Sequence, residues 1–478
     1  MPEQDPIETD ICVIGAGSGG LSVAAAAAAF GVPTVLIERD KMGGDCLNVG
    51  CVPSKALIAA ARTAHEMRHG ASRFGIANVE PDIDFTAVMA HVKGVIASIA
   101  PHDGVPRYTA MGVNVIEGEG RFVDGETVEA AGKRIRARRY VIATGSRPSV
   151  PPIDGLADTP YLTNETLFDL TERPDHLLVL GGGPIGIEMA QAFHRLGSKV
   201  TVFEAQAAMG RADRELAELA LASLRGEGID IHEGAMVSSV SGEAGAITVN
   251  TGRGQNAHST SGTHLLVATG RRLNTDTLNL DAANIAHDPK TGIEVDSGLR
   301  STTNKRVYAV GDVSGGPAFT HTAGYQAGLI MRPLLFRLPA KMNANIQPAV
   351  TYCDPPLAQI GLTEEDARQK HGKVDIRRFP LAENDRARAE RKTDGHVKLV
   401  IAGGKIVGVH IFGDAADEMI GLWCLAVQKG MKPSDVTGYV PPYPTRGEIG
   451  KRAATDYYSA MARDPRIRKL IAFLRRFG

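Results

Sequence analysis

The sequence lacks the features that mark secreted, membrane-spanning and nucleic-acid-binding chains. Only 5 cysteines occur among 478 residues, too few for the disulfide framework of a secreted protein. The longest apolar stretch near the N-terminus, 21–30, is mostly alanine and too short to span a bilayer. Residues 1–10 are acidic and show no charged-then-apolar leader. A net charge of -1 gives no electrostatic reason to expect nucleic acid as a partner.

These absences favour a protein of the reducing cytoplasm, where a cysteine pair is more often catalytic than structural. The length of 478 residues exceeds what one hydrophobic core organises, and indicates about three domains. Glycine is the residue in excess, with 54 copies, against a usual share of about 7%. Many of these glycines form short clusters directly after apolar runs. That placement favours nucleotide-binding turns over disorder.

A pattern of strand, glycine loop, helix, strand and acid occurs twice along the chain. Each copy meets the context that a dinucleotide-binding loop requires, since an apolar strand precedes the loop and a helical segment follows it. The residues of the pattern are Gly15, Gly17, Gly20 and Glu38 in the first copy and Gly181, Gly183, Gly186 and Glu204 in the second. The repetition indicates an internal duplication of a nucleotide-binding domain, and therefore two bound dinucleotides.

The chemistry of the repeated pattern is that of pyrophosphate and ribose binding. Glycines allow the tight turn and let the backbone approach a pyrophosphate, whose charge sits at the positive end of the next helix. Glu38 and Glu204 arrive about 20 residues later, where a carboxylate can bond a ribose diol. Because Glu204 would repel a 2′-phosphate, we favour NADH over NADPH. Arg211 and Arg214 are the cations that could still turn toward such a phosphate.

Two further repeats mark the domain boundaries. The runs 140–145 and 265–270 are β-rich and close on Ala-Thr-Gly, one before the second glycine loop and one after it. The simplest interpretation is a second domain inserted into the first. We therefore predict an α/β fold of two Rossmann-like dinucleotide-binding domains, one inserted in the other, plus a C-terminal α+β domain. The expected boundaries are 1–149 with 270–340, then 150–269, then 341–478.

The most specific signal is the segment 43–55, Gly-Gly-Asp-Cys-Leu-Asn-Val-Gly-Cys-Val-Pro-Ser-Lys. Residues five apart in a regular helix have Cα atoms about 8–9 Å apart, beyond the limit of about 7 Å for a disulfide. A bridge between Cys46 and Cys51 therefore needs an irregular backbone, which Gly50 permits. We expect a helix to begin near Pro53 and to lower the pKa of a nearby thiol through its dipole. No second cysteine pair accompanies Cys46 and Cys51 to complete a four-cysteine metal site.

With these motifs the chain resembles the class I pyridine nucleotide-disulfide oxidoreductases, among them dihydrolipoamide dehydrogenase and mercuric reductase. The resemblance extends over nearly the whole length and includes the segment Gly311-Asp312. It implies an enzyme with FAD in the first site, NAD(H) or, less readily, NADP(H) in the second, and a C-terminal domain that forms a homodimer. By the same resemblance, Cys51 lies against the flavin as the charge-transfer thiol. Cys46 then faces the substrate and forms the mixed disulfide.

The resemblance also implies residues of the site. Lys55 and Glu188 match the family's ion pair beside the flavin, and Asp312 matches the residue that bonds the ribityl chain. His321 lies in a segment whose backbone meets the pyrimidine edge of the flavin. The residues implied to bind cofactor are Gly15, Gly17, Gly20, Glu38, Gly43, Gly44, Lys55, Gly118, Thr144, Gly145, Ser146, Asp312, Ala318 and His321 on the FAD side, and Gly181, Gly183, Gly186, Glu204 and Gly270 on the nicotinamide side.

The C-terminal region departs from the family at one position. Disulfide reductases of this class carry His-Pro with a glutamate a few residues on, and the histidine, from the partner subunit, shuttles the thiol proton. The matching segment 441–448 keeps Glu448 but has Tyr443 in place of the histidine, and no histidine occurs from 411 to the end. A phenol with a pKa of about 10 is a poor proton shuttle. Efficient turnover of dihydrolipoamide or glutathione is therefore not expected.

Tyrosine at this position resembles mercuric reductases, and the thiolates of Cys46 and Cys51 suit a soft metal ion. The vicinal cysteine pair that ends mercuric reductases is missing from 474–478. We therefore expect a small or protein-bound disulfide, or a soft metal ion, as the acceptor. A dihydrolipoamide dehydrogenase is the alternative enzyme. A redox sensor is the alternative of another class, but two intact dinucleotide sites favour an enzyme.

Two lesser features complete the prediction. Cys12, Cys353 and Cys424 have apolar neighbours and are expected in the core. The tail 466–477 spaces apolar residues on one helical face among basic ones. We expect it to pack against the dimer mate, with contact to an anionic membrane surface as the alternative.

Overall fold

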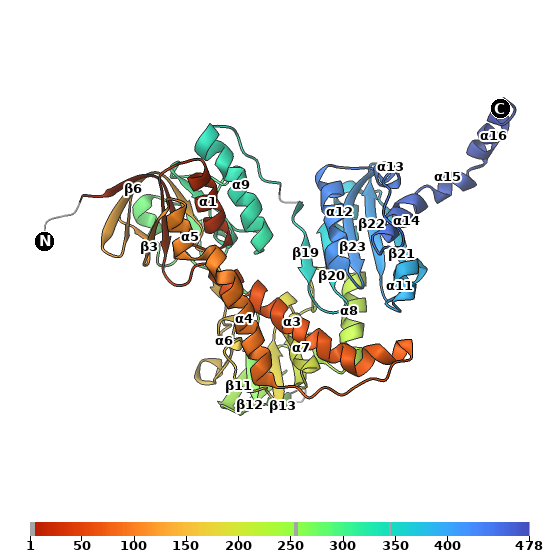
Figure 1. Cartoon of the computed structure of the whole chain (residues 1–478), viewed down its shortest axis with the longest axis horizontal. Coiled ribbons are helices and arrows are strands. Elements are labelled where there is room, and N and C mark those ends of the chain that lie inside the picture. Colours follow the sequence, from red (N-terminus) through yellow and green to blue (C-terminus); the bar gives the residue numbers. More distant parts are fainter. Residues whose placement is uncertain (1–4, 253–256, 344–345, 478) are drawn as a thin grey trace.

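The computed structural model of the chain describes residues 5–252, 257–343 and 346–477. Over these ranges the chain forms separate sheets, each with its own core, and a C-terminal helix, α16 (Pro465–Leu474), that extends away from the body (Figure 1). The predicted fold class is confirmed, with two α/β dinucleotide-binding folds followed by a domain built on an antiparallel sheet. Residues 1–4 of the acidic N-terminus lie outside the described residues.

The first sheet joins strands from two distant parts of the chain. Its order is β3-β2-β1-β6-β5-β4, and β18 pairs with β6. Alternate residues of β1 face opposite sides: Ile11 and Val13 pack under α1 and α9, while Cys12 and Ile14 belong to the core of the other face. Such a strand, buried on both faces, reads as a continuous apolar run. The elements are β1 (Ile7–Ile14), α1 (Ser18–Ala29), β2 (Thr34–Glu38), β3 (Asn114–Glu117), β4 (Arg121–Phe122), β5 (Thr127–Ala130), β6 (Lys133–Ile142), β18 (Val307–Ala309) and α9 (Thr320–Phe336).

The second sheet lies between the two halves of the first along the chain. Its strands are parallel, in the order β10-β9-β8-β14, and an antiparallel sheet β11-β12-β13 packs beside them. The two linkers that lead into and out of this region pair with each other as β7 and β15. The elements are β7 (Ser146–Pro148), β8 (His176–Leu180), α7 (Pro184–Arg195), β9 (Lys199–Glu204), α8 (Arg214–Glu227), β10 (Asp230–Glu233), β11 (Val237–Glu243), β12 (Ala246–Thr251), β13 (His258–Gly262), β14 (His264–Val267) and β15 (Arg271–Leu273). This topology agrees with an inserted domain, whose boundaries at 150 and 269 remain our proposal.

A helical hairpin connects the first two bodies. In Figure 1, α3 (Cys51–His65) and α4 (Phe85–Asp103) lie along the second body, where α3 packs on α7. Leu57 and Phe193, both fully buried, belong to the shared core. The short helix α2 (Gly44–Asn48) precedes α3, and α5 (Val105–Ala110) leads from α4 to β3.

The C-terminal body is an antiparallel sheet in the order β19-β20-β23-β22-β21. Its core centres on Trp423, which is 2% exposed and lies so close to Gly450 that a Cβ there would meet the indole at 2.5 Å. The elements are β19 (Ala349–Thr351), β20 (Leu357–Gly361), α10 (Glu364–His371), β21 (Asp375–Pro380), α11 (Asp385–Ala389), β22 (His396–Ala402), β23 (Lys405–Phe412), α12 (Ala416–Gln428), α13 (Pro433–Thr437), α14 (Glu448–Asp456) and α15 (Ser459–Arg463).

Candidate active site

The last glycine of each loop closes the turn by a backbone contact. A Cβ atom on Gly20 would lie 1.8 Å from the carbonyl oxygen of Gly15. One on Gly186 would lie 1.9 Å from the carbonyl oxygen of Gly181. Because no side chain fits in either place, both positions require glycine. The two loops therefore have the same geometry, as the sequence repeat predicts.

The first glycine of each loop lies against an Ala-Thr-Gly segment. Gly15 has φ +102° and Gly181 has φ +111°, values that L side chains rarely adopt. Their added Cβ atoms would meet the carbonyl oxygens of Ala143 at 2.5 Å and Ala268 at 2.4 Å. The strands β6 and β14 end before these segments rather than including them, which corrects the predicted strand ends. Each segment thus forms the wall against which its glycine loop turns.

The middle glycine leaves each loop open. Gly17 and Gly183 are the N-caps of α1 and α7, and a Cβ on either would have nothing within 4 Å. The free backbone N–H groups of the first helical turn and the positive end of the helix dipole face this space. The residues therefore fit a pyrophosphate at each loop, as the repeated motif predicts.

Glu38 and Glu204 hold the two loops in the same way. Glu38 accepts hydrogen bonds from the backbone N–H of Ala16 (2.6 Å) and of Asp40 (2.9 Å). Glu204 accepts hydrogen bonds from the backbone N–H of Gly182 (2.8 Å) and of Gln206 (2.9 Å). Each carboxylate thus stands at the end of its strand beside the loop, where a ribose would lie.

The site residues surround one continuous cavity of about 2240 Å³. A pocket for one drug-sized ligand measures roughly 300–1,000 Å³, so this cavity has room for more than one cofactor. The implied residues that line it are Gly15, Gly17, Glu38, Gly44, Cys46, Cys51, Lys55, Gly118, Thr144, Gly145, Ser146, Gly181, Gly183, Glu188, Glu204, Gly270, Asp312, Ala318 and His321. Those not found among the described residues of the lining are Gly20, Gly43, Gly186, Tyr443 and Glu448.

Cys46 and Cys51 lie in two consecutive helices, the short α2 and the 15-residue α3. Cys46 lies in α2, and Cys51 is the first residue of α3, so this helix begins two residues before Pro53, near the position that the sequence predicts. Proline is tolerated throughout a first helical turn, because the N–H groups there have no partner within the helix. Gly50 is needed between the thiols for another reason: a Cβ there would lie 2.7 Å from the carboxylate of Asp45. Both cysteines are free thiols.

The pKa values of the two thiols are shifted in opposite directions. A hydrogen bond from Cys46, helped by the hydroxyl of Thr320 and the charge of Lys55, lowers the pKa of Cys51 to about 6. The same hydrogen bond, together with burial, raises the pKa of Cys46. The Cys51 sulfur lies 3.5 Å from the Thr320 Oγ1 atom and at the positive end of α3. Negative charge therefore resides on Cys51, and the proton stays on Cys46.

Lys55 and Glu188 form an ion pair across the domain boundary. The Nζ atom of Lys55 lies 2.8 Å from the Glu188 carboxylate, whose other oxygen accepts from the backbone N–H of Tyr352 at 2.9 Å. The ammonium also lies 4.2 Å from the centre of the Tyr352 ring. Glu188 is 5% exposed, so its charge depends on these partners. The pair thus joins α3, α7 and the residue that follows β19, beside the thiols.

An arginine that sequence reasoning missed connects the cysteine segment 43–55, here called the redox loop, to Asp312. Arg271 follows the second Ala-Thr-Gly segment and donates to Asp45 (3.1 Å) and to the hydroxyl of Ser146 (2.7 Å). Ser146 donates in turn to the carboxylate of Asp312. Gly43 adds a backbone bond to Ala16 at 3.0 Å, which holds the redox loop on the first glycine loop. Arg271 directly follows Gly270, which the resemblance implies in cofactor binding. This position was the signal that could have identified Arg271 as a site residue.

Tyr443 lies on the C-terminal domain and is 69% exposed. Its hydroxyl donates to the carboxylate of Asp385 at 3.0 Å, and this hydrogen bond raises the pKa of the phenol. Glu448 accepts from Arg452 at 3.1 Å through Oε1, while its buried Oε2 has no partner among the described residues. The phenol is thus held in its protonated form, and the glutamate has no imidazole to orient.

The remaining predicted residues fall as follows. His321 is exposed, lies 2.9 Å from the carbonyl of Pro348 and stacks on Phe319 at 5.1 Å. Cys12 and Cys353 are buried as expected, and burial raises the pKa of both thiols. Cys424 is half-buried: it packs against the core of the C-terminal body, as expected, and also lines the large cavity. No group of three or more His, Cys, Asp or Glu side chains within the described ranges could hold a metal ion.

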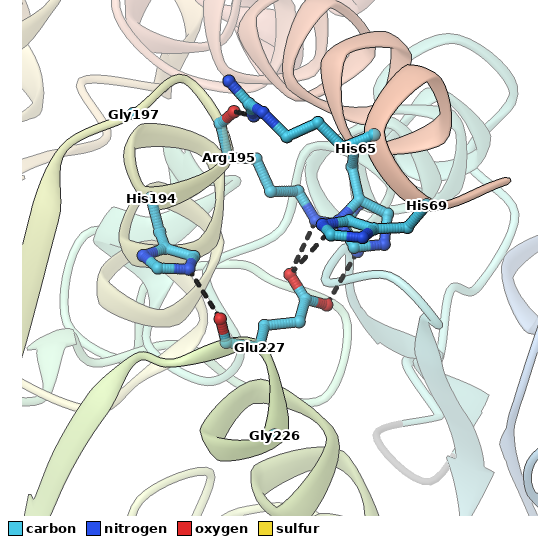
Figure 2. A pocket seen from close by; sticks show the side chains of 8 residues that line it. His65, His69, His194, Arg195, Gly197, Gly226 and Glu227 are labelled. Atoms are coloured by element: carbon cyan, nitrogen blue, oxygen red, sulfur yellow. Dashed lines mark hydrogen bonds and ion pairs between the residues drawn. The ribbon is translucent and has the colours of Figure 1, made fainter. Parts of the chain in front are cut away.

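A smaller cavity of about 490 Å³ lies where α3, α7 and α8 end (Figure 2). Arg195, which is 5% exposed, lies 2.7 Å from the carboxylate of Glu227 and 2.6 Å from that of Asp354. The His194 Nε2 atom lies 2.8 Å from the backbone carbonyl of Glu227, and burial lowers the pKa of His65. The charge of Arg195 is satisfied within the chain, so we interpret this cluster as a joint between the second and third bodies.

Comparison with known proteins gives two family matches that cover most of the chain. The model described as "Pyridine nucleotide-disulphide oxidoreductase" matches residues 9–327. The model described as "Pyridine nucleotide-disulphide oxidoreductase, dimerisation domain" matches residues 347–454. The first range contains both glycine loops, the cysteine pair and Asp312. The second contains Tyr443 and Glu448.

Individual relatives span the same length. A mercuric reductase of Lysinibacillus sphaericus is 35% identical over 94% of this chain and 82% of its own. A dihydrolipoyl dehydrogenase of Geobacillus stearothermophilus is 33% identical over 94% of this chain and 96% of its own. Among solved structures, the HOCl-induced flavoprotein disulfide reductase RclA of Escherichia coli has a TM-score of 0.82 at 28% identity, over 93% of this chain and 99% of its own. A Cu(II) complex of the same protein has a TM-score of 0.83 at 27% identity, over 94% and 99%.

Proposed function

The chain belongs to the pyridine nucleotide-disulphide oxidoreductase family, and we propose that it is an NADH-dependent reductase that acts on a soft metal ion through Cys46 and Cys51. Members of this family use FAD and a pyridine nucleotide. FAD, when bound, supplies the centre that links hydride from the nicotinamide to the cysteine pair. The residues of this chain bind and orient the cofactors and divide the proton between the thiols.

The proposal rests on the hydrogen bonds and nearby charges that shift the pKa values of three groups. Cys51 is the thiolate of the pair, and Cys46 keeps its proton. Tyr443, which stands where a disulfide reductase has its proton-shuttling histidine, is held protonated by its hydrogen bond to Asp385. The site is therefore poorly equipped to accept a proton from Cys46 and return it to a leaving thiolate.

A soft metal ion does not need that proton shuttle. When Cys46 binds such an ion, its proton leaves as the metal–sulfur bond forms, and Cys51 binds as the thiolate that it already is. The two electrons of one NADH then suffice to reduce one Hg(II) ion to the element, or two Cu(II) ions to Cu(I). The relatives named mercuric reductase and the Cu(II) complex of RclA support this class of acceptor.

A disulfide acceptor is the second candidate, because the RclA structures are described as a flavoprotein disulfide reductase and one relative as a dihydrolipoyl dehydrogenase. In that reaction the Cys46 sulfur attacks one sulfur of the substrate and expels the other as a thiolate. Cys51 then attacks Cys46, which releases the second thiolate and restores the Cys46–Cys51 disulfide. We expect this reaction to be slow here, since each departing thiolate needs a proton.

NADH is the proposed donor because the surroundings of Glu204 are unsuited to a 2′-phosphate. Arg214, one of two cations that could turn toward it, is bound to Glu233 (3.1 Å), to Glu218 and to the carbonyl of Ala208. Arg211 remains, since it lines the cavity. We therefore expect kcat/KM to be higher with NADH than with NADPH, and Arg211→Ala to lower the NADPH value further while leaving the NADH value unchanged.

The dimerisation domain at 347–454 supports a homodimer, in which we propose that Tyr443 of one subunit faces the cysteines of the other. We place the enzyme in the cytoplasm, where a reduced cysteine pair is maintained.

The acceptor is identified by NADH oxidation in the presence of Hg(II), Cu(II), lipoamide or glutathione disulfide. We expect Hg(II) or Cu(II) to be reduced in proportion to NADH, and Cys46→Ser to abolish the reaction. Cys353→Ala, which removes a buried thiol outside the pair, serves as the control. Rapid turnover of lipoamide with no metal reduction would refute the proposal in favour of the second candidate.

A further inference from the structure

The C-terminal segment 465–477 differs from the rest of the chain in composition. It contains five cationic residues and no Asp or Glu, whereas the whole sequence has 53 Lys plus Arg and 54 Asp plus Glu. The family match ends at residue 454, so this segment lies beyond both family domains. Its role is therefore not explained by dinucleotide binding or by the dimerisation domain.

Charge and apolar surface occupy separate sides of this segment. At the spacing of an α-helix, the apolar side chains form an arc roughly 160° wide. The members of this arc are Ile467, Leu470, Ile471, Phe473, Leu474 and Phe477. The cations Arg468, Lys469, Arg475 and Arg476 occupy the other side, and Arg466 is the exception, since it falls within the arc about 20° from Phe473. Helix α16 is thus amphipathic in its side-chain pattern as well as in its composition.

The apolar arc is exposed in the single chain. Leu470, Ile471, Phe473 and Leu474 are 50–55% exposed and Phe477 is 74% exposed. None of the residues of α16 is buried, and Figure 1 shows the helix projecting from the C-terminal body. Helices this short are marginal in water without a partner that covers their apolar side. We therefore expect a partner that covers the exposed apolar side of α16.

The five cations of the segment form no ion pair with the described part of the chain. Arg468 donates to the carbonyl of Ala462 at 2.9 Å, a contact that leaves its charge uncompensated. A partner for this helix must accept apolar side chains on one side and compensate positive charge along its flanks. The interface of an anionic lipid bilayer does both, since acyl chains lie beneath a layer of negative headgroups.

We infer that α16 binds this enzyme to the surface of anionic membranes, with its apolar arc in the acyl boundary and its cations among the lipid phosphates. No described helix is long and apolar enough to cross a membrane, so the helix lies in the plane of the surface. A dimer would carry two such helices, and their joint binding would exceed that of one. This inference does not depend on the electron acceptor.

The test is co-sedimentation of the full-length holoenzyme with vesicles. One set contains phosphatidylcholine with phosphatidylglycerol, and the other contains phosphatidylcholine alone. We expect binding to the anionic set that is at least about tenfold stronger and is weakened by salt. The variant R468Q/K469Q/R475Q/R476Q should lose this preference, and L470S/I471S/L474S should lose binding. The variant K370Q/K373Q, which removes two exposed cations of another surface, is the matched control.

A chain that ends at Asp464 should lose vesicle binding while it keeps its FAD content, its dimeric mass by light scattering and its NADH oxidation. Equal binding of the full-length and shortened enzymes to both vesicle sets would overturn the inference. So would a full-length enzyme that ignores vesicles and a shortened one that becomes monomeric, because the helix would then belong to the dimer interface.

Discussion

Cys51 and Thr320 meet at the first turns of two helices, α3 and α9, with 3.5 Å between the Cys51 sulfur and the Thr320 hydroxyl oxygen. They are distant in sequence, yet the hydroxyl supports the same thiolate as the dipole of α3 and the charge of Lys55. The thiolate is thus stabilised by residues of both halves of the first domain.

The thiolate of Cys51 should depend on pH. The pKa of Cys51 lies near 6, below the usual value of about 8.5 for a free cysteine. The reduced enzyme should therefore show a long-wavelength absorbance band, from the Cys51 thiolate beside oxidised flavin, that is full at neutral pH and is lost as the pH falls through about 6. The lowered pKa of Cys51 also stabilises the folded reduced enzyme. This stabilisation is full above the pKa of an unfolded cysteine, about 8.5, and is lost as the pH falls through about 6. A band with its midpoint near 8.5 would show that the thiolate is not stabilised.

Removal of the Thr320 hydroxyl should shift that midpoint upward. A hydrogen bond to a charged group contributes about 1.5–3 kcal/mol, so Thr320→Val should raise the midpoint by about one pH unit or more. Thr320→Ser keeps the hydroxyl and should restore the wild-type value. A Val variant that titrates like wild type would mean that the contact carries no energy.

Substitution of Tyr443 should change which acceptor is used. Tyr443→His places an imidazole beside Glu448, whose Oε2 has no partner among the described residues. We expect dihydrolipoamide turnover with NAD⁺ to rise by about a hundredfold, the usual contribution of a general acid–base group, with a new pKa near neutrality in the kcat/KM profile. Tyr443→Phe, which removes the hydroxyl without adding a base, should show no gain. If His and Phe behave alike, the proton argument fails.

Loss of Arg195 should destabilise the joint between the second and third bodies. Arg195→Met leaves Glu227 without its arginine and Asp354 with only the more distant Arg62, at 3.6 Å. Removal of one partner from a buried pair costs about 3–5 kcal/mol. Arg225→Met breaks the more exposed contact with Glu233 and should cost at most about 1 kcal/mol. Chemical denaturation followed by circular dichroism compares the two, and equal losses would contradict the proposed role.

The parts of the site that the sequence predicted are those that adjacent residues determine. Both glycine loops, their glutamates and the cysteine pair are local patterns, and their geometry follows from backbone sterics. The contacts of Thr320 and Arg271 were not predicted, because each joins segments more than 200 residues apart. The sequence located the start of α3 only to within two residues, because proline is compatible with several positions of a first turn.

The fate of Cys424 shows the same limit. Apolar neighbours in sequence predicted a buried thiol, and Cys424 does pack against the core of the C-terminal body, but it also lines the large cavity. Periodicity indicates that a helix has a buried side. It does not show whether a residue at the border of that side meets a core or a cavity, because this depends on the neighbouring domain.

Anaerobic titration of the enzyme with NADH tests the central claim, that Cys51 is the thiolate beside the flavin and Cys46 the thiol that meets the acceptor. We predict the long-wavelength band in the wild type after two-electron reduction, in the Cys46→Ser variant without reduction, and never in the Cys51→Ser variant. A band that persists unchanged in Cys51→Ser would contradict the assignment of both thiols.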